Sequence, residues 1–449
     1  MKKNIVLINP WIYDFAAYDF WMKPLGLLYI ASVLRQNGHN VRLIDCVNSF
    51  HPLLKMEHTV KLFPRRSSGH GKLPKESIRK PHPLSEINRN YNRYGITANI
   101  FMKELKSLTR PDLVLVTSMM TYWYPGVFDV ISVIKHVYPG IPIILGGVYV
   151  TLCPEHASLS GADFTVSGEG EKIILTVVKE LFGIEPLFAP DTGNLDSLPY
   201  PAFDLLAIKD QVPILTSRGC PYACSYCASH RLNKNFRRRD PIHVVDEISF
   251  WHRNFGVKHF SFYDDALLVN AEEVAIPMLE ELMKRKLPCH YHCPNGLHLR
   301  DVSEKLSRLM FRAGFKTIRF GFESSNELTQ FTTGGKVNNE QFKIAVGHLR
   351  KAGYTSEDIG VYLLCGLPGQ EAREVHDSIR YVQSCGARPI IAEYSPIPGT
   401  ALWDSAVSHS PFDIEREPLF HNNSLLPCQS EKLTFDVYQE LKLMTRIHS

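Results

Sequence analysis

Three closely spaced cysteines, Cys220, Cys224 and Cys227, are the residues whose types and spacing point most clearly to chemistry. One short loop with this spacing can wrap around a metal cluster, and cysteine thiolates are the usual ligands of iron–sulfur clusters. A cubane cluster takes four ligands, so three thiolates leave one iron open. Zinc is the alternative, but a zinc site needs a fourth ligand at matching spacing. The residues after Cys227 offer only His230 for that purpose.

The chain before this motif alternates between apolar strands and helical segments. We expect strands at 4–9, 41–45, 113–118, 142–145 and 164–167, and a helix at 25–36. This alternation predicts an α/β domain over residues 1–185, built on a doubly wound parallel sheet of the Rossmann type. Such sheets bind ligands outside the carboxyl ends of their strands. The candidate residues at these ends are Ser118, Gly146, Gly147 and Glu169.

The chain after residue 209 repeats the strand–helix unit six times. The expected strands end at Thr216, Tyr263, Cys293, Phe320, Leu364 and Glu393. Six units predict a partial (β/α)6 barrel of the TIM type over residues 209–405. Chemistry in barrels of this kind gathers where strands end and loops begin, and the cysteine motif follows the first strand.

Polar residues at other strand ends of this barrel allow two interpretations each, one functional and one structural. Asp264 and Asp265 follow the second strand, where paired carboxylates bind a cofactor, orient a substrate or cap a turn. The third strand, 289–293, holds alternating cysteines and histidines, for which core packing is favoured over a metal site or a radical relay. Lys336 follows a Gly-Gly turn and is expected to meet a carboxylate.

Composition restricts the class of protein. The 449 residues are 44% hydrophobic and 21% charged, which is typical of a soluble globular protein, and the net charge of +4 excludes a general polyanion binder. No apolar stretch is long enough to span a membrane, and the apolar run at the start is too short for a signal peptide. Ten cysteines without a secretion signal indicate a reducing compartment. We therefore expect a cytoplasmic protein.

Three segments lie outside the two expected domains. Residues 51–95 contain ten Lys and Arg against three Asp and Glu, which suits an arm for RNA or an acidic substrate or, as we favour, a solvated insertion. Residues 186–208 form a proline-rich linker. The tail, 406–449, has a helical pattern at 433–447 and no recognisable RNA-binding module. Nucleic acid is therefore not an expected partner.

The second half resembles the radical SAM (S-adenosylmethionine) superfamily. The resemblance rests on the cysteine motif, on Gly321-Phe-Glu-Ser324 and on Gly366-Leu-Pro-Gly369. It implies a [4Fe-4S] cluster held by Cys220, Cys224 and Cys227, whose open iron binds SAM. It also implies cofactor contacts from Tyr226, Glu323, Ser324 and Gly366, and we add Asp264 as a candidate from its place at a strand end.

The first half resembles the cobalamin (vitamin B12)-binding domain that precedes one subclass of this superfamily. The similar stretches are 24–32, 38–41, 146–147, 154–156 and 168–171. Ser118, Gly146 and Gly147 match the family positions that hold the cobalamin nucleotide tail. The Asp-x-His-x-x-Gly motif, whose histidine can ligate cobalt, is absent from the aromatic loop 10–24, so the resemblance implies cobalamin without that ligand.

Together these resemblances imply a radical SAM enzyme. One electron from a flavodoxin or ferredoxin would reduce the cluster, and SAM would be cleaved to methionine and a 5′-deoxyadenosyl radical that abstracts hydrogen from the substrate. With cobalamin bound, the outcome would be methylation of an unactivated carbon. Two alternatives remain: a mutase, cyclase or oxidoreductase with an empty N-terminal domain, and a non-catalytic iron–sulfur or corrin carrier.

Overall fold

A computed structural model describes residues 2–207 and 210–446. The chain divides into two compact units, 1–211 and 212–449. The finer division predicted above, with a linker at 186–208, stays a prediction, and Ile208 and Ile447 at the ends of two predicted segments lie outside the described residues.

The first unit is built on a five-stranded parallel sheet with the order β10-β9-β8-β1-β4. Its strands are β1 (Asn4–Asn9), β4 (Asn40–Asp45), β8 (Leu113–Val116), β9 (Ile143–Gly146) and β10 (Phe164–Val166). Its helices are α1 (Leu25–Gln36), α2 (Ala98–Ser107), α3 (Tyr124–Val137), α4 (Val148–Leu152), α5 (Pro154–Ala157) and α6 (Gly170–Phe182). The predicted doubly wound sheet is confirmed.

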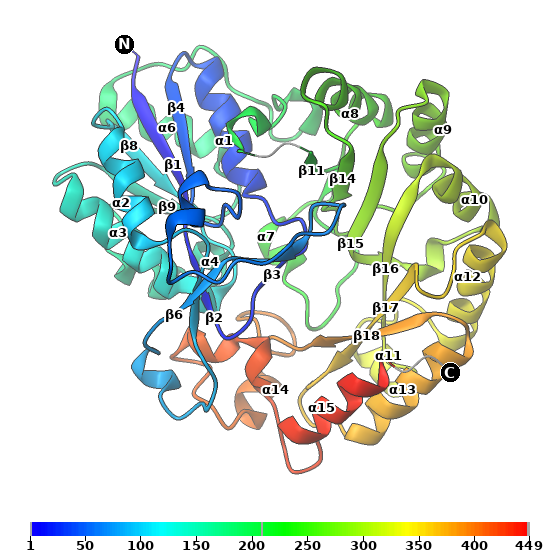
Figure 1. Cartoon of the computed structure of the whole chain (residues 1–449). Helices are drawn as coiled ribbons and strands as arrows, with labels where there is room; N and C mark the ends of the chain where they lie inside the picture. Colours follow the sequence, from blue (N-terminus) through cyan, green and yellow to red (C-terminus); the bar gives the residue numbers. More distant parts are fainter. Residues whose placement is uncertain (1, 208–209, 447–449) are drawn as a thin grey trace. The chain divides into compact units, whose positions relative to one another are not determined.

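Burial explains why these segments become strands and helices. All four residues of β8 are buried, as expected for a parallel strand covered on both faces. Helices α1 and α6 pack on each other, as do α2 and α3 (Figure 1). The Thr97 side chain accepts a hydrogen bond from the Ile100 amide and so caps the start of α2. Short 3-10 helices fill the remaining connections: η3 (Thr121–Trp123), η4 (Ser158–Ser160), η5 (Leu195–Ser197) and η6 (Phe203–Leu205).

The basic insertion is paired with the aromatic loop that follows β1. Strand β2 (Ile12–Asp14) pairs with β7 (Asn92–Tyr94), which also pairs with β6 (Lys75–Ser77), and β3 (Tyr18–Asp19) pairs with β5 (Gly71–Lys72). The insertion also forms η1 (Pro52–Met56) and η2 (His82–Leu84). Trp21 donates from its indole nitrogen to the Ser68 carbonyl at 2.7 Å, and Arg65 forms an ion pair with Asp19. The insertion and the loop therefore fold as one substructure.

The second unit is an open sheet of six strands in sequence order, with β11 and β18 at its edges. The strands are β11 (Gln211–Ile214), β14 (His259–Phe262), β15 (His290–His298), β16 (Phe315–Glu323), β17 (Ile359–Cys365) and β18 (Arg388–Glu393). Helices α8 (Pro241–Phe255), α9 (Ala275–Arg285), α10 (Glu304–Ala313), α12 (Asn339–Ala352) and α13 (Ala372–Ser384) lie along its outer side in Figure 1. The predicted partial barrel is confirmed.

Two strands of the barrel are longer than the sequence pattern predicts. The third strand was expected to end at Cys293, but β15 continues to His298 through a register shift between Cys293 and Leu297. Pro294 has no amide hydrogen for the ladder, which accounts for a bulge at this point. The fourth strand was expected to end at Phe320, but β16 continues to Glu323. Both extensions bring polar residues to the mouth of the barrel.

Shorter elements complete the second unit. They are β12 (Ser217–Arg218), β13 (Arg237–Arg238), α7 (Ser229–Leu232), η7 (Leu299–Asp301), α11 (Glu327–Thr332), α14 (Trp403–His409), η8 (Pro418–His421), η9 (Asn423–Leu425) and α15 (Phe435–Met444). Helix α15 packs against α13, and its Lys442 binds Glu393 at the end of β18. Within the residues that the structure describes, no helix is both long and apolar enough to cross a membrane.

Candidate active site

The cysteine loop is fixed at its start by a buried carboxylate. Asp264, which follows β14, accepts hydrogen bonds from the Thr216 amide at 2.9 Å, the Thr216 hydroxyl at 2.6 Å and the Ser217 hydroxyl at 2.7 Å. Asp264 is only 3% exposed, and burial raises its pKa to about 6 although these hydrogen bonds oppose the shift. These contacts position the start of the cysteine loop, and the cofactor contact of Asp264 stays a prediction.

This raised pKa gives a testable pH dependence. In the unfolded chain the Asp264 carboxyl ionises near its ordinary pKa, whereas in the folded protein it keeps its proton to about pH 6. The unfolded state thus releases the proton first, and the folded apoprotein should lose up to about 3 kcal/mol from this residue as the pH rises from about 4 to about 6. Asp264→Asn lacks this titration. Urea denaturation of both proteins from about pH 4 to about pH 6 measures this effect. As the pH rises, the free energy of unfolding of the parent protein should fall relative to that of Asp264→Asn. A difference between the two proteins that does not change with pH would contradict the prediction.

The three cysteines of the motif lie within electrostatic reach of one another. The charges of Cys220 and Cys227 both affect the pKa of Cys224, which burial raises to about 11. Burial also raises the pKa of Cys220 and of Cys227. All three are free thiols. In the described part of the chain, no three His, Cys, Asp or Glu side chains are grouped around one point that could hold a single metal ion. Cluster ligands bind separate irons, so such a grouping is not what a cubane requires.

A second group of polar residues lies against the cysteine loop. Gly334 packs on Cys224 so closely, with φ of +124°, that an added Cβ would lie 3.3 Å from the Cys224 sulfur. The turn that it forms carries Lys336 to Glu323: the Lys336 ammonium donates to Glu323 Oε1 at 2.6 Å. Tyr226, from the cysteine motif itself, donates to the same oxygen at 2.6 Å. The expected carboxylate partner of Lys336 is thus Glu323.

In this Tyr226–Glu323–Lys336 network Glu323 is buried, Tyr226 and Lys336 are partly buried, and the three are electrostatically coupled. Burial by itself would lower the pKa of Lys336, but Glu323 and Tyr226 outweigh it and hold that pKa well above its ordinary value. Burial, and then the Glu323 charge, raise the pKa of Tyr226 well above its ordinary value. Glu323 has φ of +68°, an uncommon conformation for a residue with a side chain. A small cavity adjoins the network, lined by Gly321, Phe322, Glu323, Gln330, Thr333, Lys336 and Val337.

Two other residues predicted to contact a cofactor, Ser324 and Gly366, form hydrogen bonds within the protein. The Ser324 hydroxyl is 1% exposed and donates to Glu374 at 2.8 Å. The Gly366 amide donates to the Gln370 side chain at 2.8 Å, and the cofactor contacts of Ser324 and Gly366 stay predictions. Gly366 adopts φ of +88°, and a Cβ there would lie 2.7 Å from Leu426. Both residues shape the strand ends from within.

The predicted ligand edge of the first unit brings Ser118, Gly146 and Gly147 together. The Ser118 hydroxyl donates to the Gly146 carbonyl at 2.7 Å. Glu169 lies directly before α6, half-buried. A cavity opens where β1 and β8 end, lined by Asn9, Pro10, Trp11, Ile12, Met22, Lys23, Val47, Ser118, Met119, Trp123 and Val127. The aromatic loop therefore forms one wall of a pocket at this edge.

Gly147 is the residue of this edge that tolerates least change. Its φ of +103° and ψ of −167° belong to a region used almost only by glycine, and an added Cβ would lie 2.3 Å from the Ser118 carbonyl oxygen. Gly147→Ala should therefore lower the stability of the apoprotein by about 3 kcal/mol and weaken any ligand held beside Ser118 at least about tenfold.

The matched control for this substitution is Gly140→Ala. Gly140 also has a positive φ, +76°, but has no atom within 4 Å of an added Cβ, so the expected loss is about 1 kcal/mol. Thermal melting and retention of cobalamin after gel filtration measure the two effects. Equal losses in both variants would show that the contact with Ser118 is not responsible.

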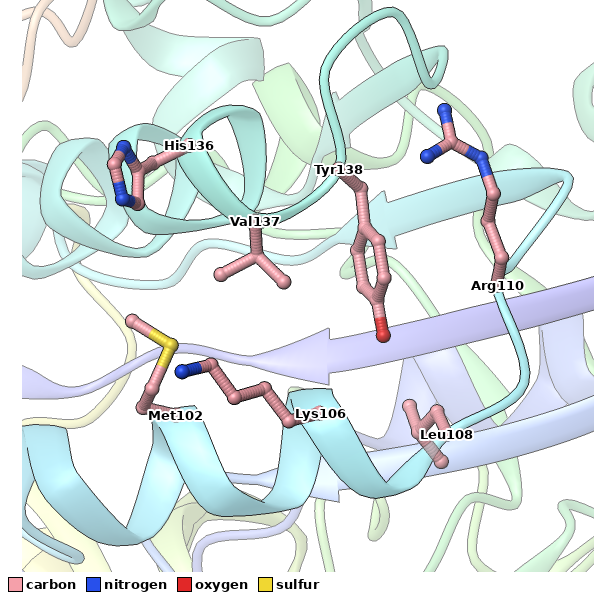
Figure 2. Close-up of a pocket in the computed structure, with 7 residues that line it drawn as sticks. All are labelled: Met102, Lys106, Leu108, Arg110, His136, Val137 and Tyr138. Carbon is pink, nitrogen blue, oxygen red and sulfur yellow. The ribbon is translucent and has the colours of Figure 1, made fainter.

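A larger cavity lies elsewhere in the first unit. Figure 2 shows this space of about 530 Å³, lined by Met102, Lys106, Leu108, Arg110, His136, Val137 and Tyr138. These residues come from the ends of α2 and α3 and the start of the segment leading into β8, which is the edge opposite Ser118. Arg110 already donates to the Pro139 carbonyl at 2.8 Å. None of the predicted site residues lines this cavity.

Comparison with protein families assigns both units. Residues 214–382 match the radical SAM superfamily and residues 96–178 match the B12-binding domain. The chain carries a radical SAM domain and a B12-binding domain. This confirms the resemblances noted in both halves of the sequence, and with them a [4Fe-4S] cluster, SAM and cobalamin as the cofactors of this domain combination.

Curated proteins similar to this chain include methyltransferases and cyclases. An uncharacterized methyltransferase of Pyrococcus horikoshii is 26% identical, covering 86% of this chain and 79% of that protein. The cytidylyl-2-hydroxyethylphosphonate methyltransferase of Streptomyces wedmorensis is 23% identical, covering 84% and 77%. The anaerobic magnesium-protoporphyrin IX monomethyl ester cyclase of Cereibacter sphaeroides is 24% identical; the match covers 66% of this chain and 53% of the cyclase.

The fold also matches solved structures. The radical SAM methyltransferase TsrM from Kitasatospora setae, solved with cobalamin and a [4Fe-4S] cluster, has a TM-score of 0.66 at 15% identity. The match covers 91% of this chain and 76% of TsrM. At this identity the likeness shows the fold, which is that of a B12-binding domain joined to a radical SAM barrel.

Proposed function

We propose that this protein is a cobalamin-dependent radical SAM methyltransferase that acts on an unactivated carbon. The observation that carries the proposal is the position of the Tyr226–Glu323–Lys336 network against the cysteine loop: Tyr226 belongs to the motif, and the turn before Lys336 packs on Cys224. A carrier has no need of that network. The methyltransferases among the relatives support the reaction class.

The residues present fit a cubane cluster and SAM. Cys220, Cys224 and Cys227 supply three thiols on one loop, none of them in a disulfide, and would hold three of the irons. Glu323 and Lys336 offer one negative and one positive group beside Cys224, which complement the ammonium and carboxylate of the methionine part of SAM. A bound cluster supplies the electron that cleaves SAM homolytically.

The chain's own contribution is placement and exclusion of water. Asp264 fixes the first residues of the loop, and Gly334 closes over Cys224. Tyr226 holds Glu323 from the loop side, so the carboxylate is oriented before a ligand arrives. Preorganised polar groups in a buried site give their full interaction with little rearrangement.

We propose that cobalamin binds in the first unit at the edge that carries Ser118, where the existing cavity of about 30 Å³ is too small to hold it without rearrangement. Ser118, Gly146 and Gly147 would hold the nucleotide tail, since glycines let a bulky ligand approach the backbone closely. The walls formed by Trp11, Trp123 and Met22 are apolar, as ligand pockets usually are. The loop 10–24 contains no histidine, so we propose that it gives cobalt no protein ligand.

A radical SAM enzyme needs an electron donor. We propose a flavodoxin or a ferredoxin in this role, because the cluster must receive one electron. We also propose a cytoplasmic location, which suits an oxygen-sensitive cluster and the ten cysteines, since these form no disulfide among the described residues.

The test is anaerobic reconstitution with iron, sulfide, cobalamin, SAM and dithionite. We expect 5′-deoxyadenosine or S-adenosylhomocysteine and, with methyl-deuterated SAM and an extract of the producing cell, a deuterated methyl group in a new product detected by mass spectrometry. If neither SAM product forms, the result would favour the alternative that the protein is a non-catalytic iron–sulfur or corrin carrier.

A cyclase is the second candidate, because anaerobic cyclases are among the relatives. A cyclase would yield 5′-deoxyadenosine without transferring the deuterated methyl group. The same experiment therefore separates the two reactions.

A further inference from the structure

A histidine outside the cysteine motif lies beside the proposed cluster site. His298 ends β15, beyond the bulge at Pro294, and is 4% exposed. Its Nε2 lies 4.0 Å from the Cys220 sulfur, which is long but within range for a hydrogen bond to sulfur. Its ring contacts that of Tyr222, with centroids 4.4 Å apart. The imidazole is thus held in place by the cysteine loop on one side and by the strand end on the other.

The two ring nitrogens of His298 differ in what they can reach. Nδ1 is buried and makes no hydrogen bond of ordinary geometry, while the Asp265 backbone forms a weaker hydrogen-bonding contact with the ring. Nε2 faces Cys220. A neutral imidazole carries one N–H, and an unpaired buried donor is costly. The tautomer with its hydrogen on Nε2 directs a donor at the Cys220 sulfur, and this is the tautomer that the inference requires.

We propose that His298 donates a hydrogen bond from Nε2 to the Cys220 thiolate and makes the bound cluster easier to reduce. This inference rests on the proposed function. Reduction adds one electron, and hence one negative charge, to a cluster and its thiolates. A donor aimed at a ligand sulfur stabilises that added charge, and hydrogen bonds to sulfur are among the factors that set cluster potentials. His298 is a positioning residue in this scheme, since it acts through Cys220.

The experiment measures the reduction potential of reconstituted protein by dithionite titration followed by electron paramagnetic resonance. His298→Leu removes the donor and should make one-electron reduction about tenfold less favourable, a shift of about 59 mV to more negative potential. His298→Gln keeps an N–H donor and should recover part of the shift. His421→Leu is the control, because His421 is 1% exposed in the same unit but binds the Ile414 carbonyl. Iron content and thermal melting are measured on each variant.

The possible results are distinguishable. A potential unchanged in His298→Leu, with iron content equal to that of the parent protein, would overturn the inference and leave the proposed function intact. Loss of iron in both His298 variants, but not in His421→Leu, would make His298 an iron ligand and also overturn it. Failure of the parent protein to bind iron would refute the proposed function itself.

Discussion

Cys224→Ala should abolish cluster binding and SAM cleavage while leaving the fold intact. The reconstituted parent protein should hold about four irons, and the variant less than about one, because a cubane held by two thiolates is open on two irons. Formation of 5′-deoxyadenosine should fall to background. Cys224 is buried against Gly334, and its loss should cost only about 1 kcal/mol of stability.

Cys385→Ala is the matched control for this prediction. Cys385 is a partly buried free thiol of the same unit, at the end of α13, and lies outside the motif. Iron analysis, cluster absorbance and thermal melting are compared across the parent and the two variants. If Cys224→Ala retains the parent's iron and activity, the assignment of the motif is wrong.

Lys336→Met should have the largest effect on stability. The substitution removes the cation that pairs with Glu323, whose side chain is 8% exposed, and so leaves a carboxylate with Tyr226 as its remaining partner in the network. Breaking a buried ion pair in this way costs about 3 to 5 kcal/mol, which corresponds to a decrease in Tm of roughly 10 °C. Affinity for SAM should fall at least about tenfold, because a charged contact is lost.

A double variant separates the structural effect from the effect on SAM. Lys336→Met with Glu323→Gln leaves no unpaired charge, so most of the lost Tm should return, while SAM affinity stays low. Lys305→Met is the control: it breaks an exposed pair with Glu272 and should change stability by less than about 1 kcal/mol. Simple additivity of the two single losses in the double variant would show that Lys336 and Glu323 are not coupled.

Local patterns made much of this fold predictable from the sequence. The apolar run of β8 and the capped helices α8 and α12 appear where propensity and capping place them. The three cysteines lie within one loop, so their grouping could be predicted without knowledge of the tertiary structure. A carboxylate partner for Lys336 was expected from the Gly-Gly turn before it, but that turn follows the short helix α11, and the sequence did not identify Glu323 as the partner.

Contacts between distant strands were not predictable in the same way. Asp264, Ser324 and Gly366 each follow a strand, as the motifs require, but their polar atoms are taken by Thr216, Glu374 and Gln370. Thr216 follows another strand, β11, and Glu374 lies in α13, so nothing local in the sequence marks these two partners. Gln370, by contrast, lies only four residues after Gly366. His298 was missed as a neighbour of Cys220 because simple alternation ended the third strand at Cys293, before the bulge.

The pairing of the insertion with the aromatic loop has a consequence for how this chain can change. Leu73, Leu84 and Tyr91 of the insertion are almost fully buried, and β2 and β3 take their ladder partners from it. Excising residues 51–95 would leave bare strand edges and apolar faces, which favour aggregation. The two stretches share strand pairs and a buried face, so an insertion or deletion in one should require a compensating change in the other.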